Sequence, residues 1–157
     1  MQYEYFCYLT HCDPFAVQYA VVYYVTSNAV CYSCMRWYHN IYGKALTTYN
    51  DNNVIEYTHY CINGELHNDI APALIQYYAS GQVREEAYYQ HDKLHCDDGP
   101  ATIGRLISGI IYNVQYYRND KLHRDDGPAM IYYDNYGDIK SATYYIDGCI
   151  TGTQSEI

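Results

Sequence analysis

Three histidines lie beside acidic residues in a motif that recurs along the chain. His67, His95 and His123 each follow a leucine and precede an aspartate by two positions, and around His123 the motif reads Leu-His-Arg-Asp-Asp-Gly-Pro-Ala. An imidazole next to carboxylates is the arrangement that general base catalysis and metal binding both use. These histidines are therefore the first candidates for chemistry.

The spacing of the three histidines argues against a shared metal ion. They recur every 28 residues. If each unit adds two strands to a sheet, equivalent side chains stand about 9.5 Å apart, whereas two imidazoles on one zinc ion need their nitrogens within about 4 Å of each other. We therefore expect these histidines and aspartates to hold neighbouring turns together by hydrogen bonds. We expect no catalytic residue, no metal and no cofactor.

The seven cysteines raise a second metal hypothesis. Cys31 and Cys34 form one C-x-x-C pair without a second pair at zinc spacing, and a site would need Cys7, Cys12 or His11 to complete it. We interpret the pair as coincidental. The scattered, odd-numbered cysteines do not suit a disulfide framework, and the N-terminus lacks the basic segment of a secretory signal. We expect a reducing compartment rather than secretion.

The histidine motif belongs to a longer unit of 28 residues, a period typical of repeat architectures whose stacked units share a core. We predict a single domain, 1–157, of about five and a half units. Residues 1–59 hold degenerate units, 60–143 regular units and 144–157 a truncated one. The tyrosines and prolines that recur at fixed positions are Tyr60, Tyr88, Tyr116, Tyr144, Pro72, Pro100 and Pro128.

Each unit contains two turn signals separated by runs that alternate apolar and polar residues, as a half-buried strand requires. The first signal is a pair such as Asn63-Gly64 or Asp147-Gly148, which suits a tight hairpin turn. The second is centred on Gly81, Gly109 and Gly137. These signals predict an all-β fold, an elongated antiparallel meander of β-hairpin repeats.

The glycines before the recurring prolines are expected to be extended. Gly99 and Gly127 precede a proline, but the equivalent residue of an earlier unit is Ala71, before Pro72. An alanine at this position indicates that the backbone does not need a positive φ. We interpret the segment as the entry into a strand, where proline does least harm.

The aromatic composition and the charge bear on the binding partner. The chain has 24 tyrosines, two phenylalanines and one tryptophan. Tyrosine covers a thin sheet while its hydroxyl stays in water, so we expect a ladder of the recurring tyrosines on one face; a tyrosine-rich binding face is the alternative. The net charge of −9 argues against nucleic acid and against anionic lipid headgroups. The apolar stretch over residues 15–25 is too short for a membrane span. We therefore expect the binding partner to be a protein.

The units that read Tyr-Tyr-x-Asn-Asp-Lys-Leu-His-Arg-Asp-Asp-Gly-Pro-Ala-x-Ile-Tyr-Tyr-Asp-x-x-Gly resemble MORN-type hairpin repeats, in a divergent variant known from large DNA viruses and phages. The similarity is clear over residues 60–150 and follows by register over 4–59. It implies a ribbon that acts as a scaffold or interaction surface without an active site.

Two functions follow as hypotheses. The first is a non-enzymatic structural or scaffolding protein of a virion, with capsid proteins as partners, found in the virion or the host cytoplasm. The alternative is a soluble adaptor, or an antitoxin- or immunity-type binding protein. Open sheet edges recruit other chains, including further copies of the same chain. We expect contacts at the two ends and on the tyrosine-rich face, with burial there of Phe6, Phe15 and Trp37.

Overall fold

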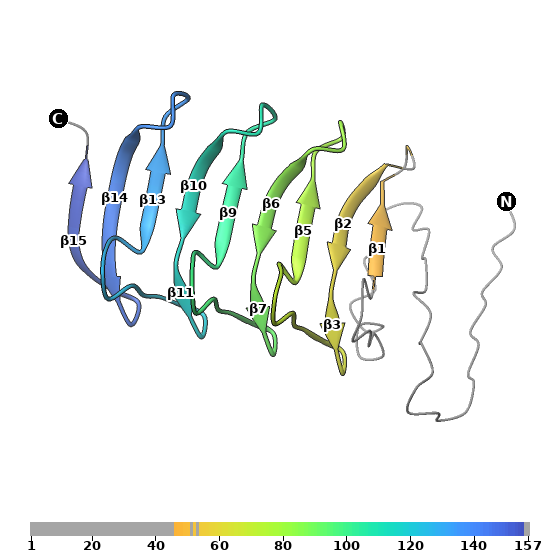
Figure 1. Cartoon of the computed structure of the whole chain (residues 1–157), viewed down its shortest axis with the longest axis horizontal. Coiled ribbons are helices and arrows are strands. Elements are labelled where there is room, and N and C mark those ends of the chain that lie inside the picture. Colours follow the sequence, from red (N-terminus) through yellow and green to blue (C-terminus); the bar gives the residue numbers. More distant parts are fainter. Residues whose placement is uncertain (1–45, 51, 53, 156–157) are drawn as a thin grey trace, which may run out of the picture.

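The structure, a computed structural model, describes residues 46–50, 52 and 54–155. Within these residues there is no helix, and nine strands form one antiparallel sheet in which neighbours in space are also neighbours along the chain, apart from short excursions (Figure 1). The strands of this main sheet are, in order, β1 (Leu46–Tyr49), β2 (Ile55–His59), β5 (Leu74–Tyr77), β6 (Val83–Ala87), β9 (Thr102–Arg105), β10 (Ile111–Gln115), β13 (Met130–Tyr133), β14 (Ile139–Ile146) and β15 (Cys149–Ser155).

The excursions are small hairpins that leave the main sheet at its lower end in Figure 1. Each pairs two residues with two residues and returns through a loop to the next strand of the main sheet. The hairpins are formed by β3 (Cys61–Ile62) with β4 (Glu65–Leu66), β7 (Tyr89–Gln90) with β8 (Lys93–Leu94), and β11 (Tyr117–Arg118) with β12 (Lys121–Leu122).

The predicted all-β antiparallel meander is confirmed. The sheet is open, with β1 and β15 as the outermost of its described strands. Equivalent strands begin 28 residues apart, as β5, β9 and β13 do at residues 74, 102 and 130. The strand β1 begins at residue 46, so it extends this spacing by one further unit toward the N-terminus. The part of the predicted repeat that precedes residue 46 lies outside the described residues.

Both predicted turn types have the backbone that their sequences favour. The lower turns place two consecutive residues at positive φ, for example 53° at Asn63 and 83° at Gly64, which is the geometry of a two-residue hairpin turn that matches the twist of the strands. In the upper turns Gly81, Gly109 and Gly137 have φ between 86° and 92°. Gly99 and Gly127 are absent from the residues with positive φ, in agreement with the alanine at position 71.

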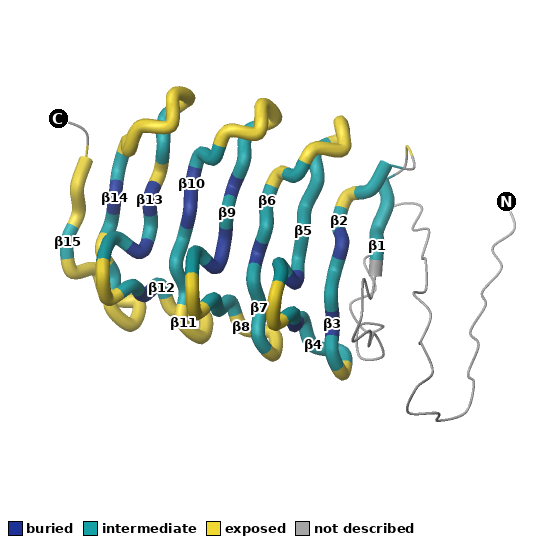
Figure 2. Tube along the Cα trace, in the orientation of Figure 1, coloured by how far each residue is buried: buried dark blue, intermediate teal, exposed yellow. Residues whose placement is uncertain are grey.

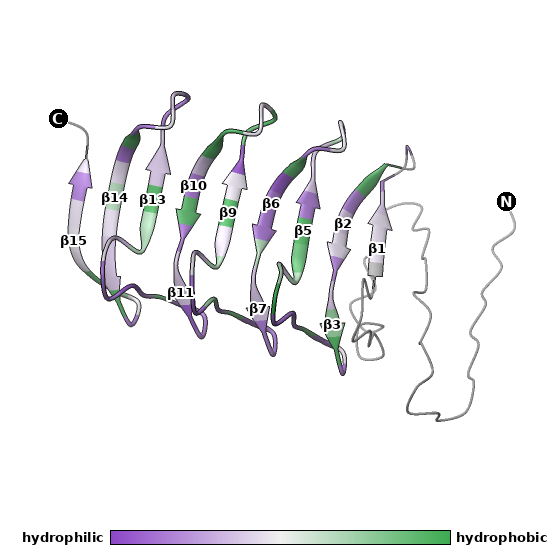
Figure 3. Ribbon diagram, in the orientation of Figure 1, coloured by the Kyte–Doolittle hydropathy of each residue, from purple (hydrophilic) through white to green (hydrophobic). Residues whose placement is uncertain are grey.

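The core of the described residues is thin and made of small side chains. Figure 2 shows buried segments in the main strands and in the lower loops, and Figure 3 shows that the hydrophobic segments are short and interrupted by hydrophilic ones. Ala73, Ala101 and Ala129 have no exposed surface, and Thr58 is the largest side chain that is fully buried. A single sheet has no second layer to bury large apolar groups, which is why half-buried tyrosines cover its surface.

Candidate functional site

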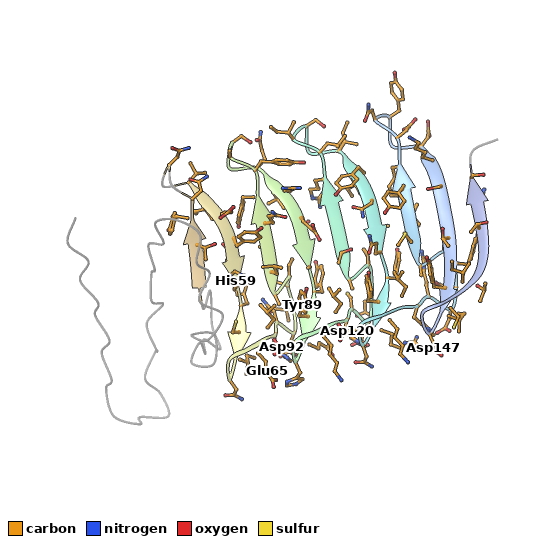
Figure 4. The ribbon with its side chains drawn as sticks, turned by 180° about the vertical axis from the view of Figure 1, so that it is seen from behind. His59, Glu65, Tyr89, Asp92, Asp120 and Asp147 are labelled. Atoms are coloured by element: carbon orange, nitrogen blue, oxygen red, sulfur yellow. The ribbon has the colours of Figure 1, made fainter. Side chains whose placement is uncertain are left out.

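The recurring motif folds into three loops, over residues 67–72, 95–100 and 123–128, which connect each lower hairpin to the next main strand. The loops and hairpin turns run along one long margin of the sheet. Figure 4 shows this margin from behind, with Glu65, Asp92, Asp120 and Asp147 along it. The candidate histidines therefore lie in a row at the margin and do not converge on one point.

A tyrosine marks the point where each hairpin separates from the main sheet. The N–H of Tyr88 donates to the carbonyl of Ala101 across the main sheet (2.8 Å), while its own carbonyl accepts from the N–H of His95 in the loop (3.1 Å). Tyr60 and Tyr116 make the equivalent pairs of bonds. The two backbone groups of one residue thus serve two different sheets, and this brings the histidine back beside the strand.

The recurring tyrosines lie on one face of the main sheet. Residues two positions earlier, such as Glu86 and Val114, belong to one continuous row of cross-strand partners, and residues in such a row share a face. The register therefore places Tyr60, Tyr88, Tyr116 and Tyr144 on that same face. Buried Ala73, Ala101 and Ala129 stand between them.

Each histidine connects its own loop to the hairpin turn of the following unit. Nε2 of His95 lies 3.0 Å from Oδ1 of Asp97, and Nδ1 accepts a hydrogen bond from the N–H of Asn119 at 3.3 Å. His67 and His123 have the same two bonds, to the carboxylate two residues on and to the backbone N–H 24 residues on. A backbone N–H only donates, so at His67 and His95 we assign the ring proton to Nε2.

The side chain that the following unit places beside the histidine differs from one loop to the next. The ring of His91 packs at 4.5 Å, centroid to centroid, from the ring of His67. At the C-terminal end, Oδ1 of Asp147 lies 3.0 Å from Nδ1 of His123, which places this ring between two carboxylates. His123 is also the most enclosed of the three rings, with 5% of its side chain exposed.

A second set of bonds joins the same units. The N–H of Leu66 donates to Oδ1 of Asp92 at 2.6 Å, and the carbonyl of Leu66 accepts from the N–H of Asp92 at 3.0 Å. Leu94 and Asp120 repeat this pair of bonds. Asp92 and Asp120 thus have two roles. Each adopts the positive φ of its hairpin turn, and each bonds to the preceding unit.

The loops have little capacity for metal or base chemistry. Both nitrogens of His67, His95 and His123 are engaged in hydrogen bonds, which leaves none for a substrate or a metal ion. The hydrogen bond from His95 holds the pKa of Asp97 below its usual value. Over the described ranges there is no group of three or more metal-ligating side chains. Cys31 and Cys34, which we interpret as a coincidental pair, lie outside them.

Sequence reasoning missed two arginines of the last unit, Arg124 in the loop and Arg118 in the hairpin before it. The guanidinium of Arg124 lies 4.0 Å from the centroid of the Tyr116 ring, and its Nε donates to Oδ1 of Asp126 at 2.7 Å. Arg118 donates to Oδ2 of Asp125 at 2.8 Å. The signal in the sequence is that Arg118 and Arg124 differ from the residues at the equivalent positions of the other units.

The remaining predicted contacts, Phe6, Phe15 and Trp37, lie outside the described residues. Within the described residues no helix is long and apolar enough to cross a membrane. No protein-family model, no curated protein and no solved structure matches the chain. The resemblance to hairpin repeats therefore rests on the motif alone.

Proposed function

We propose that the protein is a non-enzymatic scaffold that mediates contacts between proteins, as a virion component associated with the capsid. The observation that carries this proposal is β15, the last strand of the main sheet. It pairs with β14 on one side, and six of its seven residues are exposed, including Ile150 at 62%. An exposed strand with a free row of backbone groups adds a strand of another chain by main-chain hydrogen bonding.

The histidine loops support the same proposal. Their hydrogen bonds are used to fix neighbouring units to one another, so the recurring residues serve the rigidity of the ribbon. A rigid ribbon presents its margins, turns and end strand at fixed distances, which is what a scaffold requires.

The test is incorporation of edge variants into particles. A lysine on an edge strand hinders strand addition, so Ile150→Lys is expected to reduce the copy number of the protein in purified particles. Ile107→Lys is the matched control, because Ile107 is similarly exposed, at 58%, but lies in an upper turn. Equal incorporation of both variants and the unaltered protein contradicts a role for this edge, and absence of the protein from particles contradicts a virion component.

The alternative adaptor role predicts a different result. An adaptor that binds one soluble protein gives a complex of fixed stoichiometry without particles, which size-exclusion chromatography with light scattering measures. The N-terminal units provide a further comparison: deletion of residues 1–31 is expected to abolish association while residues 60–150 stay folded. If the deleted protein still associates, these residues only cap the ribbon.

A further inference from the structure

The last histidine loop contains a complete binding site for a guanidinium group, filled by the chain itself. Arg124 stacks over the ring of Tyr116, donates from Nε to Asp126 and from Nη1 to the carbonyl of Pro128 at 3.4 Å. Only a quarter of the Arg124 side chain is exposed. Stacking on an aromatic ring combined with a charged hydrogen bond is the characteristic way in which proteins hold arginine.

One unit earlier the same site is present without the arginine. Subtracting 28 from each position gives Tyr88 for the ring, Asp98 for the carboxylate and Pro100 for the carbonyl, but Cys96 in place of Arg124. These four residues line a cavity of about 310 Å³, which the loop of the preceding unit closes on another side. The short thiol therefore leaves open the volume that the guanidinium occupies in the next unit.

A glycine preserves the room for the missing group. A Cβ on Gly127 would lie 3.2 Å from Cζ of Arg124, so glycine there gives the guanidinium its space. A Cβ on Gly99 would meet only Sγ of Cys96, at 3.9 Å. Neither glycine has a positive φ. The conformation does not require Gly99, but a guanidinium held there as Arg124 is held in the next unit would lie tightly against a Cβ at this position.

The charges of the cavity are also unbalanced. In the last unit Arg118 of β11 and Arg124 of the loop pair with Asp125 and Asp126. In the cavity the equivalent aspartates, Asp97 and Asp98, remain, joined by Asp69 from the preceding loop, while Gln90 replaces the other arginine. Asp97 is bonded to His95 and lies in the field of Arg118, so among the described residues it is Asp98 that pairs with no basic side chain. The nearby Arg105 is committed to Glu86 at 2.9 Å.

The site is confined to this unit within the described residues. In the preceding loop the position of the second aspartate is Ile70, and the position of the arginine is Asn68. The carbonyl of the Asn68 side chain accepts from the N–H groups of Ile70 and Ala71, at 3.2 and 3.3 Å. That loop closes on its own asparagine and lacks the carboxylate.

We propose that the cavity above Tyr88 receives an arginine side chain from a partner protein. The guanidinium stacks on the Tyr88 ring, donates to the carboxylate of Asp98 and to the carbonyl of Pro100, and lies over Gly99. This site rests on the proposed function and specifies it, because it names the side chain by which a partner is recognised on the margin of the ribbon.

The test is a titration of the full chain with N-acetyl-arginine-N-methylamide, followed by backbone amide NMR shifts, with the lysine analogue as control. We expect saturable shifts centred on residues 88 and 96–100, with affinity in the millimolar range and weaker binding of lysine, which cannot stack as a planar fork. Asp98→Asn is expected to weaken binding roughly tenfold. Cys96→Arg is expected to abolish it, because the chain then fills its own site.

Two further variants keep the test independent of folding. Gly99→Ala places a methyl group tightly against the bound guanidinium, so it is expected to weaken binding of the probe. Alanine is already present at the equivalent position 71, so the melting temperature is expected not to change. Arg124→Cys is expected to open a second site and to add saturable shifts around residues 116 and 124–127. The proposal is overturned if the arginine probe causes no saturable shifts in the original protein or in Arg124→Cys. It is also overturned if the lysine analogue binds equally well.

The same variants separate this inference from the proposed function. If the arginine probe does not bind while Ile150→Lys still loses association, the arginine site is wrong and the scaffold stands. If the probe binds but the protein is absent from purified particles, the arginine site stands and the virion scaffold is wrong. If Asp98→Asn lowers both probe binding and incorporation, both are supported.

Discussion

Arg105 and Glu86 compensate each other across the neighbouring strands β9 and β6. Nε and Nη2 of Arg105 both donate to Oε2 of Glu86, at 3.1 and 2.9 Å, with less than a third of either side chain exposed. Each residue is an exception to the pattern of the repeat. The residues at the position of Glu86 in the other units are Thr58, Val114 and Ala142, and those at the position of Arg105 are Tyr49, Tyr77 and Tyr133.

The compensation predicts a strongly non-additive pair of substitutions. Arg105→Tyr alone leaves a half-buried carboxylate without its partner, and we expect the free energy of unfolding to fall by about 1–2 kcal/mol. Glu86→Val together with Arg105→Tyr restores the residue types of the other units, and we expect stability within about 1 kcal/mol of the original. Urea denaturation of both single variants and the double variant measures the coupling. Additive losses contradict it.

His123 connects its own loop to the next hairpin turn, so we expect it to contribute more to stability than its partner Asp125. His123→Ala leaves the N–H of Asp147 without an acceptor and empties an enclosed position, so we expect a loss of about 1–3 kcal/mol in the free energy of unfolding. Asp125→Ala removes an exposed carboxylate and leaves the bond to Asp147 intact. Its loss in the same denaturation experiment is expected to be smaller. Equal losses mean that the ring does not hold the next unit.

Two glycines with ordinary φ are predicted to respond in opposite ways to alanine. A Cβ on Gly104 would collide with Oδ1 of Asn113 and approach the Tyr112 ring to 2.7 Å, at the bulge where β10 pairs with β9. We expect Gly104→Ala to cost about 1–3 kcal/mol, because ring and strand must shift. Gly99→Ala is expected to leave the melting temperature unchanged, since its nearest atom is 3.9 Å away. A fully folded Gly104→Ala of unaltered stability contradicts the packing.

The features that every unit shares were open to prediction from the sequence. Asn63-Gly64 and Gly81 predict turns because asparagine and glycine adopt a positive φ more readily than other residues do, and all three residues have a positive φ. The alternation at Ala129 and Ile131 predicts a strand with one buried face, and both residues are buried. These signals are local, which is why they yielded the antiparallel meander.

The features that depend on one backbone group or one unit could not be predicted. The separate hairpins exist because the N–H and the carbonyl of Tyr88 bond in different directions, and a side-chain pattern carries no record of that. Periodicity describes what units share, so Cys96 and Arg124 appeared only as variation. Their relation lies in three dimensions, in the cavity beside Cys96 and in the equivalent site that Arg124 fills.

His59 should make the stability of the sheet depend on pH near neutrality. Burial lowers the pKa of this imidazole below its ordinary 6.5, and its Nδ1 finds no hydrogen-bond partner among the described residues. As the pH falls through 6.5, the unfolded chain binds a proton that the folded chain does not yet accept, so the free energy of unfolding falls. The contribution of His59 to the free energy of unfolding is fully present above pH 6.5, and it is lost as the pH falls toward the lower pKa of the folded state.

The matched variant is His59→Gln, because Gln115 occupies the equivalent position two units later. We expect its free energy of unfolding to change less than that of the original protein when urea denaturation is repeated between about pH 8 and pH 5, since the group that titrates differently in the two states is gone. Parallel curves for the original protein and His59→Gln would show that burial of His59 does not oppose its protonation.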